Sequence, residues 1–336
     1  LQHARLGGHA RPPLLQFRYE PAAEACVTAA QSTFWSCQLG PPRVTVVGPD
    51  CADAERRFAA RYPQARAHAG LALDIQFLPF DWHAHPVDLA QLQALHAQRG
   101  PATALVVSTG SDADNIGVAL ALKRACNETK FWPAPIYMKE TNQTEFSKTF
   151  ASGDETEEHD AYIQAFGSMQ TVATFRLICD GQLDRGAGTA HKYYELGSGE
   201  RSGRKNELEA AGRNWREVKE TYRVANRAVA DSALVKLWDG GWRPAQGTEV
   251  GDEHPALPDG LILPLAEVEH ARWCAERVLA GWQPGQPRDN VRRIHSSLKP
   301  WAELSQGEKD KDVTQVSAAV EIATLFTPQG FVRLPR

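Results

Sequence analysis

The sequence predicts two consecutive domains, an α/β domain built on a parallel sheet and then a mainly α-helical domain. At 336 residues the chain exceeds the usual size of one domain. Its first half alternates short apolar runs with helical stretches, which is the pattern of a parallel sheet covered by helices. In the second half this alternation stops and tryptophans concentrate. We therefore place the boundary near Asp180–Gly188.

The expected elements follow from apolar runs and helix-start signals. Asp53 and Ser111 are suitable N-cap residues for two of the helices. We expect residues 1–13 to be a tail, 14–180 the α/β domain and 181–336 the helical domain. The expected strands are Leu14–Phe17, Arg43–Gly48, Asp74–Asp81, Thr103–Thr109, Pro135–Lys139 and a short one at Tyr162–Phe166, and the expected helices are Ala22–Trp35, Asp53–Tyr62, Pro86–Gln98 and Asp112–Ala125.

Composition excludes several classes of function. The formal charge of −4 gives no general attraction to nucleic acid or to an anionic membrane. The six cysteines form no CxxC pair, which favours isolated thiols in a reducing compartment. No run reaches the roughly 18 apolar residues of a membrane span. We expect a cytoplasmic protein, and because the chain begins without methionine, one cut from a longer protein.

Two segments of the first half resemble the TrkA-N or RCK domains of bacterial potassium-transport regulators. These are VTVVGPD at Val44–Asp50 and VVSTGSDADNIGVALALK at Val106–Lys123, followed by the strand PIYMK. The resemblance covers roughly Leu14–Phe166 and implies a Rossmann fold, a parallel sheet with flanking helices.

This Rossmann fold is degenerate at its phosphate-binding turn. Dinucleotide folds need glycines after the first strand so that backbone amides approach the pyrophosphate. Here that turn is FRYEPAA, Phe17–Ala23, without a glycine. Three interpretations stay open: a structural or dimerising scaffold, Arg18 binding another anion, or orthodox NAD binding with Asp50 on the ribose.

The second half resembles the RyR domain, a repeat of ryanodine receptors and many bacterial proteins. The resemblance covers residues 265–324 and is carried by EHARWCAERVLAGW, RDNVRRIHSSLKPWAEL and SQGEKDKD. A fainter copy lies upstream: His191 to His270 and Tyr194 to Trp273 are both 79 positions apart, while Trp215 to Trp301 and Asn226 to Asp312 are both 86. We expect a domain of two pseudo-symmetric repeats, at about 188–242 and 262–330.

The second repeat carries the expected binding site. Val268, Ala271, Ala275, Val278 and Leu279 form an apolar stripe at helical spacing, and Trp273 lies nearly opposite. That indole needs a partner, either the other repeat or a ligand ring. Aromatic rings beside an arginine suit a planar anion such as a nucleotide. The candidate ligand-binding residues are His270, Trp273, Arg277, Trp282, Arg288, Asp289, His295 and Trp301, with Arg18, Asp50, His191, Tyr194 and Trp215 as secondary candidates.

Catalytic and metal-binding patterns are weak. The sequence contains no GxSxG elbow, P-loop or HExxH, and no cysteine placed with a nearby histidine in a recognisable order, so we expect no enzyme. His83 and His85 make an HxH pair without a third ligand, so we expect no metal. The charged run at Glu308–Asp312 is interpreted as a solvated helix face.

These observations predict a regulatory sensor. The RyR domain would bind a nucleotide-like messenger, with cyclic nucleotides and ADP-ribose derivatives as the ligand classes to test. The Rossmann domain would mediate homodimerisation and transmit the signal. The two resemblances also imply a context in ion-transport regulation, with a membrane channel segment elsewhere in the full protein, or in antiviral defence. The alternatives are a protein–protein interaction scaffold without a small ligand and an NAD(P)-dependent enzyme; no nucleic-acid partner is expected.

Overall fold

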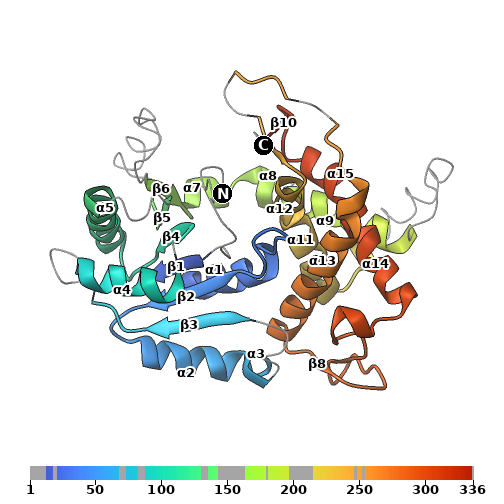
Figure 1. The fold of residues 1–336 in the computed structure, drawn as a ribbon, viewed down its shortest axis with the longest axis horizontal. Coiled ribbons are helices and arrows are strands. Elements are labelled where there is room, and N and C mark those ends of the chain that lie inside the picture. Colours follow the sequence, from blue (N-terminus) through green and yellow to red (C-terminus); the bar gives the residue numbers. More distant parts are fainter. Residues whose placement is uncertain are drawn as a thin grey trace. The chain divides into compact units, whose positions relative to one another are not determined.

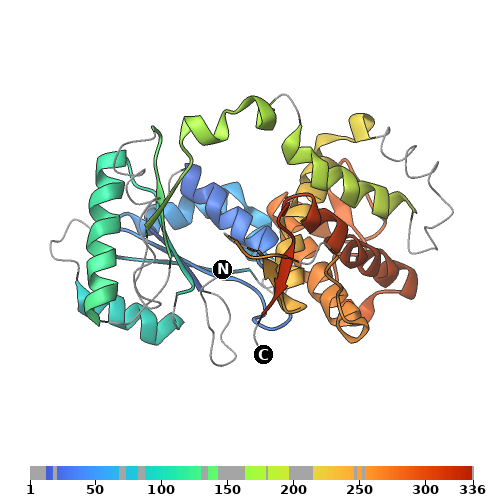
Figure 2. The same ribbon diagram turned by 90° about the horizontal axis from the view of Figure 1, so that it is seen from above.

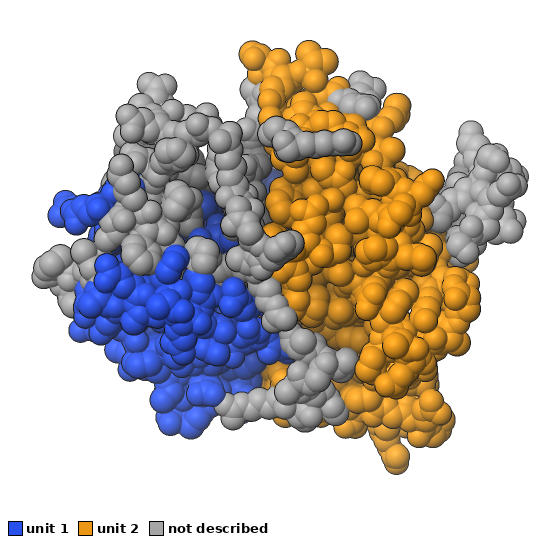
Figure 3. All heavy atoms as spheres, in the orientation of Figure 1, with its two compact units in different colours: residues 1–30, 42–61, 73–180 blue, residues 31–41, 62–72, 181–336 orange. Residues whose placement is uncertain are grey.

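The computed structural model describes residues 13–17, 21–67, 73–81, 88–100, 102–129, 135–142, 163–178, 181–196, 215–245, 248–251 and 254–334. These residues form two compact units (Figure 3). Unit 1 consists of residues 1–30, 42–61 and 73–180, and unit 2 of residues 31–41, 62–72 and 181–336. None of the described helices combines the length and the apolar character that a membrane span requires.

Unit 1 is an α/β unit with one six-stranded sheet in which all strand pairs are parallel (Figure 1). The strand order is β3-β2-β1-β4-β5-β6. Strands β2 and β3 therefore lie on one side of β1, and β4, β5 and β6 follow on its other side. Ser111 caps α5 as predicted, since its hydroxyl accepts the amide of Asp114. The elements are β1 (Pro13–Phe17), α1 (Pro21–Thr33), β2 (Arg43–Val47), α2 (Cys51–Arg61), β3 (Asp74–Leu78), α4 (Leu89–Arg99), β4 (Ala104–Val107), α5 (Asp112–Thr129), β5 (Ile136–Lys139), β6 (Ile163–Phe166), α7 (Met169–Val172) and α8 (Phe175–Ile178).

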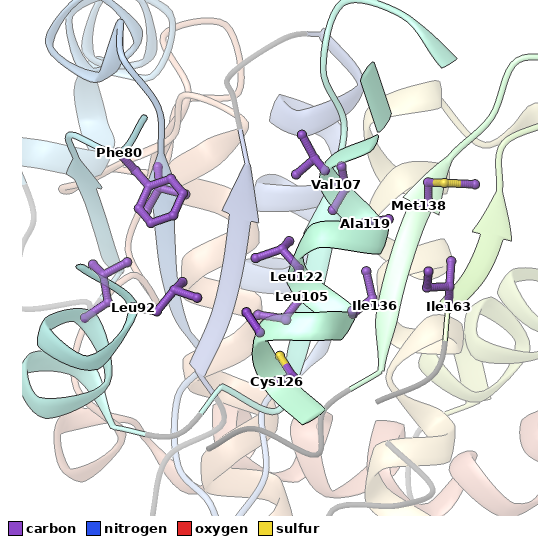
Figure 4. Close-up of a cluster of buried hydrophobic side chains, with 14 residues drawn as sticks. Phe80, Leu92, Leu105, Val107, Ala119, Leu122, Cys126, Ile136, Met138 and Ile163 are labelled. Carbon is purple, nitrogen blue, oxygen red and sulfur yellow. The ribbon is translucent and has the colours of Figure 1, made fainter. Parts of the chain in front are cut away.

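The central strands β2 and β4 are buried on both faces and are apolar on both sides, as parallel strands usually are, whereas β3 is only partly buried. Helices α4 and α5 cover one face through a cluster of aliphatic side chains around Leu105, Leu122 and Ile136 (Figure 4). Helix α1 lies on the opposite face (Figure 2). Phe58 of α2 packs there against Phe77 of β3, with ring centroids 5.7 Å apart.

Unit 2 is mainly helical and repeats its own order of elements. The 3₁₀ turn, the following helix and the start of the next helix all recur 86 positions later, and the two helices that precede the 3₁₀ turns are α9 and α13. Its elements are α3 (Pro63–Ala67), α9 (Gln182–Leu196), η2 (Trp215–Glu217), α11 (Glu220–Asp231), α12 (Ala233–Asp239), β7 (Trp242–Pro244), α13 (Asp259–Leu279), β8 (Gln283–Pro284), β9 (Ile294–His295), η3 (Trp301–Glu303), α14 (Gln306–Ser317), α15 (Ala319–Thr324) and β10 (Phe331–Arg333).

The contacts within unit 2 have the reciprocity of a twofold arrangement. Helix α9 packs on α11 as α13 packs on α14, and the cross contacts α9–α14 and α13–α11 are also both present. Helix α12 packs on its counterpart α15, and β7 pairs antiparallel with β10. The two helical repeats of unit 2 thus share one core. Its buried residues include Leu237, Trp242, Ile322 and Phe331.

Unit 2 also contains residues 31–41, which the sequence pattern places in the first domain. The Asp239 carboxylate accepts the Ser36 hydroxyl and, at 2.8 Å, the Cys37 amide. Arg272 donates to the Ser32 carbonyl at 2.9 Å. These hydrogen bonds to buried charged groups attach the segment to α12 and α13.

Candidate functional site

Helix α13 and the loop that follows it position the candidate site. The helix ends in a Schellman motif at Gly281, whose φ of 83° is a conformation that glycine adopts without strain. The Gly281 amide donates to the Val278 carbonyl at 3.0 Å, and the Trp282 amide to the Arg277 carbonyl at 2.9 Å. This geometry directs Trp282 back against the helix, where it packs with Cys274 and Leu298.

The helix face opposite the apolar stripe is itself buried. His270, Cys274 and Arg277 are at most 4% exposed, and only Trp273 on this face is partly accessible. The apolar stripe is therefore not the only buried part of α13, since these three side chains are covered as well. The loop after α13 covers this face. A helix can be buried on two sides when each of its buried charges has a partner.

His270 is held between two hydrogen-bond acceptors. Its Nδ1 lies 3.2 Å from the Asp312 carboxylate and its Nε2 lies 2.8 Å from the Lys299 carbonyl oxygen. A ring that faces acceptors at both nitrogens must be protonated on both, which makes it an imidazolium. Burial opposes this charge, but the hydrogen bonds to Asp312 and Cys274 raise the pKa of His270 to about 10.

A series of aromatic rings, each close to the next, begins at this cation. Trp273 stacks on His270 with centroids 5.6 Å apart, and Trp301 lies 5.9 Å from the same ring at 52°. Trp273 also meets His295 edge-on at 5.0 Å, and His295 in turn meets Trp282 at 5.9 Å. Five candidate residues from distant parts of the segment thus form one aromatic wall.

His295, unlike His270, is neutral. Its Nδ1 accepts the Ser297 amide at 3.1 Å, so the proton of the neutral ring is on Nε2 and can be donated. Burial and the positive charges of Arg288, Arg277 and Lys311 lower the pKa of His295 to about 4. A neutral donor close to several cations is suited to receive an anion.

The remaining candidates differ in accessibility. Arg288 is exposed, and its Nε donates to the Asn290 side chain at 3.0 Å. Arg277 is buried, is paired with Glu276, and lies over the Trp282 ring at 5.7 Å, so it supports the wall from behind. Asp289 accepts the amides of Val291 and Arg292, at 2.8 and 3.0 Å, and shapes its own loop.

Three residues that the sequence pattern did not assign to the site contribute to it. Asp312 contacts His270, and Glu308 accepts the Ser297 hydroxyl at 2.6 Å, so the charged run of α14 is not simply a solvated face. Lys311 adds positive charge near His295. The register of the internal repeat, which aligns Asn226 with Asp312, was the one signal that could have identified Asp312.

Cys274, His270 and Asp312 form a linear arrangement that resembles a catalytic triad. The Cys274 Sγ lies 3.4 Å from the His270 Nε2, and Asp312 is bound to Nδ1. However, the thiol is only 1% exposed, and the Lys299 carbonyl already accepts from Nε2. A substrate therefore has no access to the sulfur, and the arrangement carries no reaction that we propose.

The first repeat reproduces half of this geometry. The His191 and Trp215 rings are 5.8 Å apart at 52°, and Arg223 lies 5.5 Å over Trp215 as Lys309 lies 5.5 Å over Trp301. Tyr194 is 50% exposed at the position equivalent to Trp273. Asn226 replaces Asp312, and its amide donates to its own helix at the Tyr222 carbonyl. Burial lowers the pKa of His191, and the charge of Glu195 opposes this effect without cancelling it.

The candidates of unit 1 do not form a comparable site in the part of the chain that the structure describes. The Asp50 carbonyl accepts the amides of Asp53 and Ala54, so α2 begins two residues before the predicted N-cap Asp53. Arg18, His83 and His85 lie outside the described residues. No cluster of three metal-ligating side chains occurs among those that are described.

Comparisons with known families find a match for this part of the chain. Residues 259–327 match the RyR domain. The match spans α13 to α15, so it contains the whole aromatic wall, His270, His295 and Asp312. The same comparisons find no TrkA-N or RCK match for the α/β part. No curated protein matches the chain.

Proposed function

We propose that this protein is a ligand sensor whose RyR segment binds a planar anion of the nucleotide class. One observation carries the proposal: His295 is kept neutral, with its proton on Nε2, beside the partly exposed Trp273 and near the positive charges of Arg288 and Lys311. The indole supplies a stacking surface, the imidazole one hydrogen bond, and the cations the attraction for phosphate.

The energetic balance favours such a ligand. Stacking of a base on an accessible indole is worth about 1–3 kcal/mol. A hydrogen bond from arginine to a phosphate contributes roughly 1.5–3 kcal/mol because the charge assists it. Arg288 has the accessibility for this role, whereas the guanidinium of Arg277 is already paired with Glu276.

For unit 1 we propose a Rossmann-type scaffold that dimerises and transmits the signal. Its strand order is that of doubly wound nucleotide-binding sheets, whose ligands bind where the order reverses. At that edge the first turn of α5 carries Asp112 and Asp114, and Asp112 already accepts the Thr141 amide at 3.0 Å. Two carboxylates there disfavour a pyrophosphate, which supports a scaffold over an NAD site.

Helix α1 supplies a route for transmission. It begins in unit 1, while its last turn belongs to unit 2. There the Ser32 carbonyl accepts from Arg272, which directly precedes Trp273 in the sequence. A ligand that shifts α13 therefore acts on a helix that continues into the sheet unit.

Calorimetry with a panel of cyclic di- and trinucleotides and ADP-ribose derivatives tests the sensor. We expect at least one to bind, with about 5- to 150-fold weaker affinity for Trp273→Ala. Tyr194→Ala, the equivalent change in the first repeat, is the matched control and should leave the affinity unchanged. A folded wild-type protein that binds none of the panel would contradict the proposal. Light scattering then tests the homodimer, which a monomeric mass at micromolar concentration would exclude.

A scaffold without a small ligand remains the second candidate. The loop at 288–293 exposes Val291 almost completely between arginines, as a protein-binding loop tip does. This candidate predicts that Val291→Ser abolishes capture of a partner while the nucleotide panel fails to bind wild-type protein.

A further inference from the structure

We propose that Asp312 determines which repeat binds the ligand, because it holds His270 as a buried cation behind Trp273. The inference rests on the proposed function and names the residue that regulates its site. Asp312 does not touch the ligand in this proposal, so it is a positioning residue.

The two repeats are a natural comparison of one site with and without this carboxylate. The histidine–tryptophan pairs have the same tilt and differ by 0.1 Å in separation, 5.8 against 5.9 Å, and both tryptophans carry a cation at 5.5 Å. The difference lies behind the histidine. His270 meets the Asp312 carboxylate, whereas Asn226 at the equivalent position turns to the Tyr222 carbonyl.

The charge on His270 follows from its hydrogen bonds. Asp312 and the Lys299 carbonyl are both acceptors, at 3.2 and 2.8 Å, so both ring nitrogens donate. Two bonds at opposite ends of the ring also fix its orientation, and Trp273 stacks on a ring that cannot turn. The indole is thereby held in place before a ligand arrives, which lowers the entropic cost of binding.

The groups around His270 leave this charge in place. Cys274 on α13 contacts the ring at 3.4 Å, and Lys309 of α14 lies beyond Trp301. Burial raises the pKa of Asp312, the hydrogen bond to His270 lowers it, and Glu269 and Arg272 act on it with opposite sign. The imidazolium is thus a positive charge next to Trp273 that the Asp312 carboxylate compensates at Nδ1, while Arg288 and Lys311 add positive charge near His295. An anionic ligand is favoured at this position over a neutral or cationic one.

Asp312→Asn is the sharpest test, because an asparagine can donate to Nδ1 and leave a neutral ring bonded to Lys299. Imidazole ¹⁵N spectra between pH 6 and 10 report the charge of His270. We expect a doubly protonated ring to at least pH 8 in the wild type and a neutral one in the variant. Asp312→Glu should restore the charge. Asn226→Asp, the reverse exchange, should leave His270 as in the wild type.

ADP, which combines a planar base with phosphates, serves as the binding probe. Its binding is measured by the change in chemical shift of the Trp273 indole. We expect roughly tenfold weaker binding for Asp312→Asn in a protein that still folds but melts at a lower temperature, because the variant loses a buried ion pair. Both the binding and the melting temperature should recover in Asp312→Glu. A neutral His270 in the wild type at pH 8 would overturn the inference whatever binds. Equal ADP affinity of wild type and Asp312→Asn would overturn it even with the expected charge. If neither ADP nor any of the panel binds the wild type, the proposed function fails and the binding role of Asp312 with it, while the spectra still decide the charge.

Discussion

Glu269 offers the largest stability effect that the structure predicts. Its carboxylate is 1% exposed and lies between two buried cations, with the Lys236 Nζ at 2.9 Å and the Arg272 Nη2 at 2.7 Å. Arg272 continues to the Ser32 carbonyl, and Lys236 also contacts Ser232. The two cations hold the pKa of Glu269 at about 2 against the opposing effect of burial.

Glu269→Gln removes the one negative charge while it preserves the shape of the side chain. Two buried cations would then lose the carboxylate that lies between them, and only the charges of Asp239 near Lys236 and of Glu276 and Asp312 near Arg272 would offset them. Breaking a buried ion pair from one side costs about 3–5 kcal/mol, because the remaining charge stays desolvated. Burial already lowers the pKa of Lys236, so the amine should lose its proton in the variant. The loss of stability should therefore shrink as the pH rises towards 10.

Urea unfolding followed by tryptophan fluorescence measures this loss in the transition of unit 2. Glu220→Gln is the control, since Glu220 pairs with Arg227 in the same unit but has a side chain that is 63% exposed. Exposed pairs contribute only about 0.2–1 kcal/mol. A loss below about 1 kcal/mol for Glu269→Gln, equal to that of the control, would refute the reasoning that the buried triad depends on its carboxylate.

Two further predictions concern the candidate site. The pKa of His295 is lowered to about 4, so between pH 6.5 and 4 the unfolded chain binds a proton that the folded protein does not, and the free energy of unfolding should fall by at most about 3 kcal/mol over this range. Denaturation at several pH values should show a smaller pH dependence of this free energy for His295→Asn. The same pH dependence in variant and wild type would contradict the assignment. Gly281→Ala should destabilise unit 2 by about 1–2 kcal/mol and weaken ligand binding, because φ at this position is 83°. Gly260→Ala, in the first turn of α13 with open space around its Cα, should be neutral or stabilising, and equal melting temperatures of the two variants would argue against the Schellman motif as the cause.

The elements of the sheet unit could be predicted well from the sequence. Apolar runs such as 43–47 and 104–107 are strands in the structure, and the helix at 112–129 begins after its predicted cap, Ser111. Helix and strand periodicities are local properties, so a single sequence contains them. The strand order could not be read this way, because pairing joins residues that are far apart in the chain.

The sequence predicted which aromatic residues meet at the site, but it did not predict what each of them does there. The aromatic residues of EHARWCAERVLAGW and of the loop after it do meet, as their types and spacing indicated. Which of them face solvent was not predictable, since Arg277 and Trp282 are buried only because Glu276, Thr221 and Leu298 cover them.

The sequence by itself determined the alternating elements of the first half, the helical second half with its internal repeat, and the set of rings and charges in residues 259–327. Tertiary structure alone decided three things: that residues 31–41 are part of unit 2, that Glu269 and Arg272 are buried together, and that His270 is charged while His295 is neutral. The physical reason is common to all three. Burial of a polar group is tolerated only where a partner compensates it, and these partners, Asp312 for His270 and Ser32 for Arg272, are 42 and 240 positions away in the chain.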